Sequence, residues 1–118
     1  MRIIFTGLTG FVGKNLRQHL ISKSDKVIPL SLRSGDYQLD NTADAIIHLA
    51  GKAHDTKNTS DDNEYYRANT DLTIALFDKF LQSDIKDFIF FSSVKAAADS
   101  VEGTLTEDSK ANPQTAYG

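Results

Sequence analysis

Three glycines near the amino terminus, Gly7, Gly10 and Gly13, stand between an apolar run and a helical pattern. A dinucleotide-phosphate site requires this order. The first glycine permits a tight turn with unusual backbone angles, the second lets the main chain approach a pyrophosphate, and the third lets helix and strand pack closely. The helix start then offers unpaired N–H groups and a positive dipole end to the anion. The spacing is G-x-x-G-x-x-G rather than the commoner G-x-G-x-x-G. A glycine-rich turn that binds no ligand is the alternative, but the position between a strand and a helix favours a binding site.

Two hydroxyl groups near the other end of the chain could act on a substrate. Ser93 follows the apolar run 88–91, and Tyr117 is the penultimate residue. A serine hydroxyl can hold a substrate oxygen, and a tyrosine can exchange its proton when a cation lies nearby. That cation is usually a lysine one helical turn later, and the sequence stops at Gly118, before position 121.

The choice of nucleotide is left open by the residues that follow the second apolar run, 27–30. Sites that prefer NAD usually place an acid here, and none occurs before Asp36. Arg33 stands where the 2′-phosphate of NADP would lie, although a solvated loop arginine is an equal alternative. Asp40, at the end of a possible short strand, could accept from the adenine amino group or cap a turn.

Three further polar residues near these positions are given structural or solvated roles. His48 is predicted to be a packed strand histidine, whereas Lys52 and His54 are expected to be solvated in the following loop. Asn69 lies on the apolar stripe of a long helix, and a buried amide needs hydrogen-bond partners. We expect Asn69 to tie that helix to the strand carrying His48, or to orient groups near a cofactor.

The elements that position these groups alternate between strand and helix. Apolar runs predict strands at 2–6, 27–30, 45–50 and 88–91, and a short strand at 37–40. Helical periodicity predicts helices at 11–22 and 61–82, and the second of these is capped by Ser60 or Asp61. A short turn of helix is expected near 96–98. Alternation of this kind predicts an α/β fold, a Rossmann-type doubly wound parallel sheet of about five strands. In such a sheet, ligands bind at the carboxyl ends of the strands, where the suggestive residues lie.

Composition narrows the class of protein. The chain has 118 residues, enough for one domain spanning 1–118, and 40% of them are hydrophobic. A net charge of −3 argues against a nucleic-acid partner, and no run is long enough for a membrane span or a signal peptide. Because cysteine is absent and no targeting segment is found, we expect a cytoplasmic protein, and we predict no metal site.

Five motifs in order resemble the amino-terminal part of an extended short-chain dehydrogenase/reductase of the NAD-dependent nucleoside-diphosphate-sugar epimerase/dehydratase group. They are residues 6–13, 44–51, 66–69, 88–95 and 113–118. The form Ser-Ser-Val-Lys at 92–95 is similar to that of bacterial UDP-sugar 4-epimerase-like enzymes of surface-polysaccharide pathways. The resemblance covers essentially the whole chain.

The resemblance implies roles for the matching residues. Ser93 would hydrogen-bond the sugar hydroxyl or ketone, and Tyr117 would remove the hydroxyl proton as hydride passes to NAD or NADP. The pyrophosphate would be cradled by Gly7, Gly10, Phe11, Val12 and Gly13. The adenosine and ribose would be lined by Leu49, Ala50 and Gly51.

Departures from the family pattern limit what the chain can do. The segment between strands 27–30 and 45–50 is short, so we expect the helix usual there to be lost. The acid after the second strand is missing, and the Tyr-x-x-x-Lys helix and sugar-binding region are absent. We therefore expect a catalytically inactive piece of a protein that acts on a nucleotide sugar, with an uncovered apolar face that makes it a homo-oligomer. The alternatives are an NADP-dependent sugar or carbonyl reductase of the same family and a non-catalytic module that senses NAD(P).

Overall fold

The computed structural model describes residues 1–52 and 61–118. In chain order the elements are β1 (Arg2–Thr6), α1 (Phe11–Ser22), β2 (Lys26–Pro29), β3 (Ala45–His48), α2 (Asp62–Tyr65), the π-helical η1 (Tyr66–Asp71), α3 (Leu72–Leu81), β4 (Asp87–Phe90) and the 3₁₀ turn η2 (Val94–Ala96).

The four strands form one parallel sheet in the order β2-β1-β3-β4. The chain leaves β1 toward β2 on one side and returns to β3 on the other. The strand order therefore reverses between β1 and β3, and a crevice opens there at the carboxyl ends. This arrangement confirms the predicted Rossmann-type sheet.

The predicted strand at 37–40 is wrong, so the described residues form four strands rather than about five. The stretch from 30 to 44 contains neither strand nor helix, which confirms that the usual helix is lost. The apolar residues of this stretch fill the core instead: Leu32 and Tyr37 are buried, and Leu39 packs against them. Burial also raises the pKa of the Tyr37 phenol.

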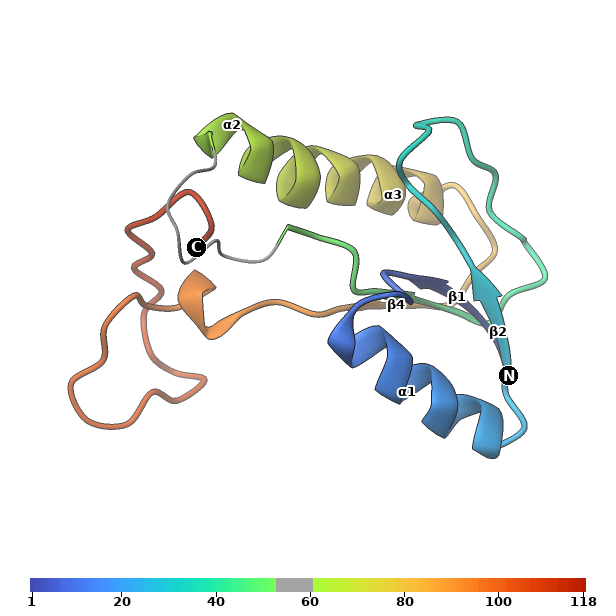
Figure 1. The fold of residues 1–118 in the computed structure, drawn as a ribbon, viewed down its shortest axis with the longest axis horizontal. Coiled ribbons are helices and arrows are strands. Elements are labelled where there is room, and N and C mark those ends of the chain that lie inside the picture. The colour runs from blue at the N-terminus through green and yellow to red at the C-terminus, as the bar shows by residue number, and fades with distance from the viewer. Residues whose placement is uncertain (53–60) are drawn as a thin grey trace.

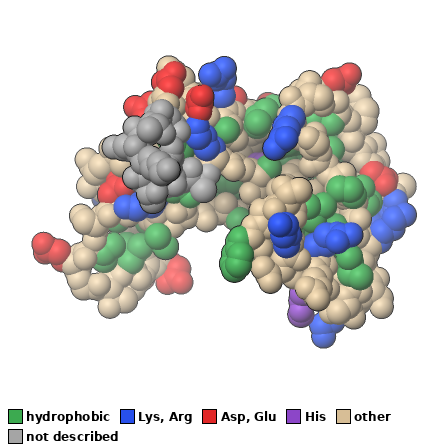
Figure 2. All heavy atoms as spheres, viewed as in Figure 1, with side chains coloured by type: hydrophobic (Ala, Val, Ile, Leu, Met, Phe, Trp, Pro, Cys, Tyr) green, Lys and Arg blue, Asp and Glu red, His purple; other side chains and the backbone are tan. Residues whose placement is uncertain are grey.

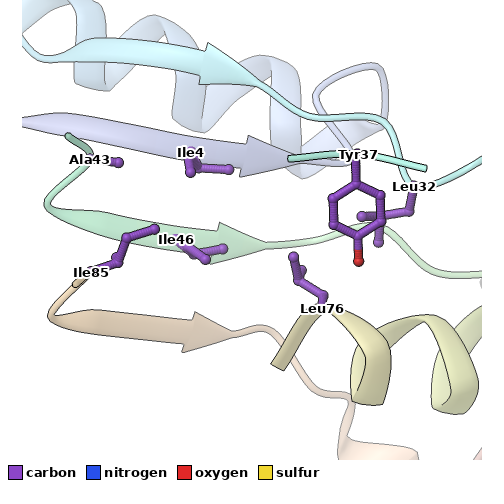
Figure 3. Packing of buried hydrophobic residues seen from close by; sticks show 7 residues of the cluster. All are labelled: Ile4, Leu32, Tyr37, Ala43, Ile46, Leu76 and Ile85. Atoms are coloured by element: carbon purple, nitrogen blue, oxygen red, sulfur yellow. The ribbon is translucent and has the colours of Figure 1, made fainter. Parts of the chain in front are cut away.

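Alternation along the strands divides the core into two layers. Ile3, Phe5 and Ile47 pack against Leu16 and Leu20 of α1 on one face of the sheet. Neighbouring residues of the same strands point to the other face because strand side chains alternate. There they meet Leu76 of α3 in a cluster that also contains Ile4, Leu32, Tyr37, Ala43, Ile46 and Ile85 (Figure 3). Figure 1 shows the sheet between α1 on one side and the α2–η1–α3 helix on the other.

The long helix predicted at 61–82 is present as α2, η1 and α3 in succession. The Asp61 side chain accepts from the Asn63 N–H, so Asp61 is the N-cap, and Ser60 lies outside the described residues. The widened π turn contains Asn69, whose carbonyl accepts a 2.6 Å hydrogen bond from the Thr73 hydroxyl. A hydroxyl that occupies the carbonyl four residues back weakens the α-helical ladder, which agrees with the local change in pitch.

The chain after β4 is largely irregular and extends beyond the carboxyl ends of the strands (orange to red in Figure 1). In residues 1–52 and 61–118, no helix is long and apolar enough to cross a membrane. On the face drawn in Figure 2, acidic and basic side chains are interspersed.

Candidate functional site

A cleft of about 550 Å³ lies at the carboxyl ends of the strands, where the strand order reverses. It gathers residues from the first loop, the end of β3, the π turn and both segments that carry the predicted catalytic hydroxyls. Most of the predicted site residues line it, namely Gly7, Gly10, Phe11, Val12, Gly13, Leu49, Ala50, Gly51, Ser93 and Tyr117. Their roles toward a ligand stay predictions.

The glycine loop is packed too tightly for any other residue at two of its three positions. Gly7 has φ +74°, and a Cβ built there would lie 2.7 Å from the Ala50 nitrogen. A Cβ on Gly13 would lie 2.3 Å from the Gly7 carbonyl oxygen. The loop therefore packs tightly against both α1 and the end of β3. Gly10 has more room, since its Cβ would be 3.4 Å from the nearest atom.

The amino terminus of α1 has no side-chain cap. Its N-cap is Gly10, which has no side chain, and its first turn contains no acid. The first N–H groups of a helix have no intrahelical partner and carry a partial positive charge. Because Phe11, Val12 and Gly13 line the cleft, this end of the helix suits an anionic ligand such as a pyrophosphate.

A buried polar chain joins the glycine loop to the long helix. The Thr6 hydroxyl lies 2.6 Å from His48 Nδ1, and His48 Nε2 lies 2.8 Å from the Thr73 hydroxyl. The N–H groups of Leu49 and Ala50 donate to the Thr6 oxygen at 3.2 and 3.1 Å. Thr6 and His48 are fully buried, as the prediction of a packed histidine required.

The hydrogen-bond partners determine the tautomer of His48. Thr73 donates its only proton to the Asn69 carbonyl, so it can only accept from His48, which places a proton on Nε2. Nδ1 then accepts from Thr6. Burial lowers the pKa of His48, which keeps the ring neutral as this pattern requires.

Asn69 holds the backbone just after β3, which confirms the structural role expected for it. Its Oδ1 accepts from the Lys52 N–H at 2.6 Å, and its Nδ2 donates to the Lys52 carbonyl at 3.0 Å. Gly51 fits beneath it, because a Cβ there would lie 2.9 Å from Asn69 Oδ1. The Lys52 side chain pairs with the Glu64 carboxylate rather than being simply solvated.

The sequence interpretation missed Thr6 and Thr73. A signal for Thr6 was present, because strand alternation places it on the face of Ile4, where a buried hydroxyl needs partners. Thr73 lies four residues after Asn69 and thus on the same side of the helix.

The structure brings Ser93 and Tyr117 to the same cleft from separate segments. Ser93 caps η2, where its Oγ accepts from the Lys95 N–H at 3.2 Å. The hydroxyl proton of Ser93 is left for another acceptor. The Tyr117 ring packs edge-on against the Tyr65 ring, with centroids 5.9 Å apart.

Arg33 and Asp40 are not among the residues of this cleft. The Asp40 carboxylate accepts hydrogen bonds from Thr42 and, at 2.7 Å, from the Arg2 guanidinium. Arg2 begins β1, so this contact lies at the end of the sheet opposite the glycine loop. These contacts, the Thr42 hydroxyl first, lower the pKa of Asp40 to about 2. Asp40 therefore caps the turn at Thr42, which is the alternative that the sequence left open, and it lies outside the cleft. His54 lies outside the described residues.

Comparison with known proteins gives a consistent result. A family model described as "NAD dependent epimerase/dehydratase family" matches residues 3–118. A curated UDP-glucose 4-epimerase of Vibrio cholerae is 35% identical over 98% of this chain and 42% of its own length. A UDP-2-acetamido-2,6-beta-L-arabino-hexul-4-ose reductase of Pseudomonas aeruginosa is 32% identical over 87% of this chain and 28% of its own length.

Solved structures share the fold at lower identity. MoeE5 in complex with UDP-glucose and NAD has a TM-score of 0.83 at 21% identity, and the match covers 100% of this chain and 44% of that protein. RMD from Pseudomonas aeruginosa complexed with NADPH has a TM-score of 0.73 at 24% identity, covering 98% of this chain and 44% of that protein.

The chain spans about 42% of the length of the curated 4-epimerases that it matches. The family model, in contrast, matches it over nearly every residue, including the glycine loop and both predicted catalytic hydroxyls. The chain therefore belongs to the NAD-dependent epimerase/dehydratase family.

Proposed function

We propose that this chain is the NAD(P)-binding part of a nucleotide-sugar epimerase or dehydratase. The observation that carries the proposal is the uncapped start of α1 beside a glycine loop that admits no Cβ at Gly7 or Gly13. Gly7 and Gly10 to Gly13 would hold the pyrophosphate through main-chain N–H groups. Leu49, Ala50 and Gly51 would line the nucleoside.

The bound dinucleotide would accept and return a hydride, and the chain would manage the oxygen and its proton. The Ser93 hydroxyl would donate to the sugar oxygen while its own oxygen is fixed by the Lys95 N–H. Tyr117 would take the proton of the sugar hydroxyl and give it back. Because Ser93 and Tyr117 share one cleft, the arrangement favours an enzyme over a module that only senses NAD(P).

The 118-residue chain alone is proposed to bind dinucleotide without turning over a nucleotide sugar. The lysine expected at position 121 and the sugar-binding region both lie outside the sequence, which spans less than half the length of the 4-epimerases it matches. A cytoplasmic location stays a prediction from composition.

Arg33 supports a second candidate, an NADP-dependent reductase of the same family. The backbone pairing of β1 and β2 continues to Leu30, whose N–H donates to the Phe5 carbonyl at 2.9 Å. The residues after Leu30 therefore leave the sheet near the glycine loop. Ser31 and Arg33 are exposed there, and neither carries the negative charge that favours NAD.

Calorimetric titration with NAD and with NADP tests both proposals. We expect binding of at least one coenzyme, and we expect Arg33→Glu to lower the ratio of NADP to NAD affinity about tenfold, because a carboxylate repels the 2′-phosphate and accepts from a ribose hydroxyl. Lys86→Glu makes the same charge change at an exposed position near the amino ends of the strands and should leave the ratio unchanged. An unaltered ratio in Arg33→Glu would remove Arg33 from the site, and no heat with either coenzyme would remove the proposed function.

We also propose that the chain forms a homo-oligomer through the β4 side of the sheet. Among the strands of residues 1–52 and 61–118, β4 pairs only with β3, and Ile89, Phe90 and Phe91 are each about half exposed. An unpaired strand edge with apolar side chains favours association. We expect Ile89→Lys to shift sedimentation toward monomer, whereas Ile21→Lys on α1, where Ile21 is equally exposed, should not. Monomeric unmodified chain at high concentration would contradict this proposal.

A further inference from the structure

The Asp99 carboxylate holds the segment that carries Tyr117. The Gln114 N–H donates to Oδ2 at 2.6 Å, and the Thr115 hydroxyl donates to Oδ1 at 3.4 Å. The Gly118 N–H donates in turn to the Thr115 oxygen at 3.2 Å. Residues on both sides of Tyr117 are therefore tied to one carboxylate, directly or through a hydroxyl.

The same carboxylate is fixed to the segment that carries Ser93. Lys95 Nζ lies 3.4 Å from Asp99 Oδ1 and donates to the Asp99 carbonyl at 3.1 Å. The Lys95 N–H meanwhile donates to Ser93 Oγ. Asp99 thus connects the two segments that bring predicted catalytic hydroxyls into the cleft.

A backbone contact also joins these segments, because Gly118 lies against Lys95: a Cβ built on Gly118 would lie 2.4 Å from the Lys95 carbonyl oxygen. Residues 111–115 are exposed, so burial holds them only weakly, and the stretch from 112 to 118 contains no helix or strand. The backbone contributes one isolated bridge, Ala98 with Asn112, and the hydrogen bond from the Asn112 N–H to the Ala97 carbonyl at 2.8 Å. Both involve Asn112, and neither involves residues 113–117, where Gln114 and Thr115 contact the Asp99 carboxylate. The Gln114 N–H, which is the main cause, holds the pKa of Asp99 below its ordinary value, so the carboxylate is charged at neutral pH.

We propose that Asp99 is a positioning residue that sets the placement of Tyr117 relative to Ser93 through Gln114 and Thr115. The inference rests on the proposed function, because it assigns Asp99 a part in the reaction only if Tyr117 exchanges the substrate proton. Asp99 itself does not line the cleft.

Nuclear magnetic resonance of the 118-residue chain tests the geometry. We expect Asp99→Ala to speed amide exchange at Gln114 and Gly118 at least tenfold and to weaken the ring contact between Tyr65 and Tyr117, while the amides of β1 and β3 stay protected. Asp99→Asn keeps an acceptor and should recover most of the protection. Asp108→Ala removes an exposed acid of the same region and should resemble the unmodified chain. Unchanged exchange and ring contact in Asp99→Ala would overturn the proposal.

Two further measurements separate the possible failures. Thr115→Val should free the Gly118 amide and leave the Gln114 amide protected, which keeps the test valid if Asp99→Ala does not fold. In the longer enzyme that the proposed function implies, Asp99→Ala should lower kcat about 10- to 100-fold with little change in KM, and Asp99→Asn should restore much of it. Equal kcat in Asp99→Ala would overturn the positioning role, whereas absence of coenzyme binding in the unmodified chain would overturn only the proposed function.

Discussion

Gly13→Ala should lower the free energy of unfolding by about 2–3 kcal/mol, although alanine is the better helix former. Helix propensity alone predicts a gain of about 1 kcal/mol, because Gly13 lies inside α1. The added Cβ would lie 2.3 Å from the Gly7 oxygen and 2.9 Å from the Leu8 Cα. Both are backbone atoms that cannot rotate away, so α1 must move off the loop. Overpacking this severe costs about 3 kcal/mol or more, the upper end of the usual range, so a net loss remains after the helix gain is subtracted.

Urea unfolding followed by circular dichroism measures the effect, and calorimetry with the preferred coenzyme measures its consequence. Displacing α1 also displaces its first N–H groups, so we expect affinity to fall at least tenfold. Gly10→Ala is the matched control for the stability measurement, since its Cβ would lie 3.4 Å from the nearest atom. It should cost less than about 1 kcal/mol, as expected for an N-cap alanine. A stabilised Gly13→Ala protein would show that the contact between loop and helix is looser than described.

Thr6→Val should cost about 3 kcal/mol while preserving the shape of the side chain. The Thr6 oxygen accepts from two N–H groups and its proton goes to His48 Nδ1, so all of its hydrogen-bonding capacity is in use. Valine leaves the buried His48 Nδ1 and two half-buried N–H groups without this partner. A buried unsatisfied group costs about 1–3 kcal/mol, and a half-buried one costs less. Unfolding in urea gives the loss directly.

Thr6→Ser separates the hydroxyl from the methyl group. Serine keeps the oxygen and loses one buried methyl, so its loss should stay near 1 kcal/mol. If valine and serine destabilised the protein equally, the hydroxyl would contribute nothing beyond packing, and the polar chain through His48 would have no energetic role.

Local sequence patterns were sufficient to predict the helices and strands that have strong periodicity. The predicted bounds of β1 and α1 are those of the structure, because an apolar run followed by glycines leaves little freedom for either end. The error at 37–40 arose because Tyr37 and Leu39 alternate as in a strand. In the structure Tyr37 is buried in the cluster that contains Leu76 of α3, Leu39 is partly buried against that cluster, and neither belongs to a strand of the described sheet. Tertiary packing, not backbone pairing, produced the pattern there.

The candidate site was predictable where function depends on backbone, and less so where it depends on distant contacts. The glycine loop and the small residues after β3 were predictable from residue type alone, because close backbone packing requires small side chains. The contact between Asp40 and Arg2 could not be predicted, because the two residues are distant in sequence. The role of Asp99 was invisible for the same reason, since it arises only when residues 112–118 fold back beside it.

The hydroxyl of Thr6 also bears on how a coenzyme would enter. Because the Thr6 hydroxyl holds the first loop against the end of β3, the coenzyme-binding surface is already formed before coenzyme binds. Coenzyme binding should then cost the protein little conformational entropy, and the backbone should be nearly the same in the free and bound states.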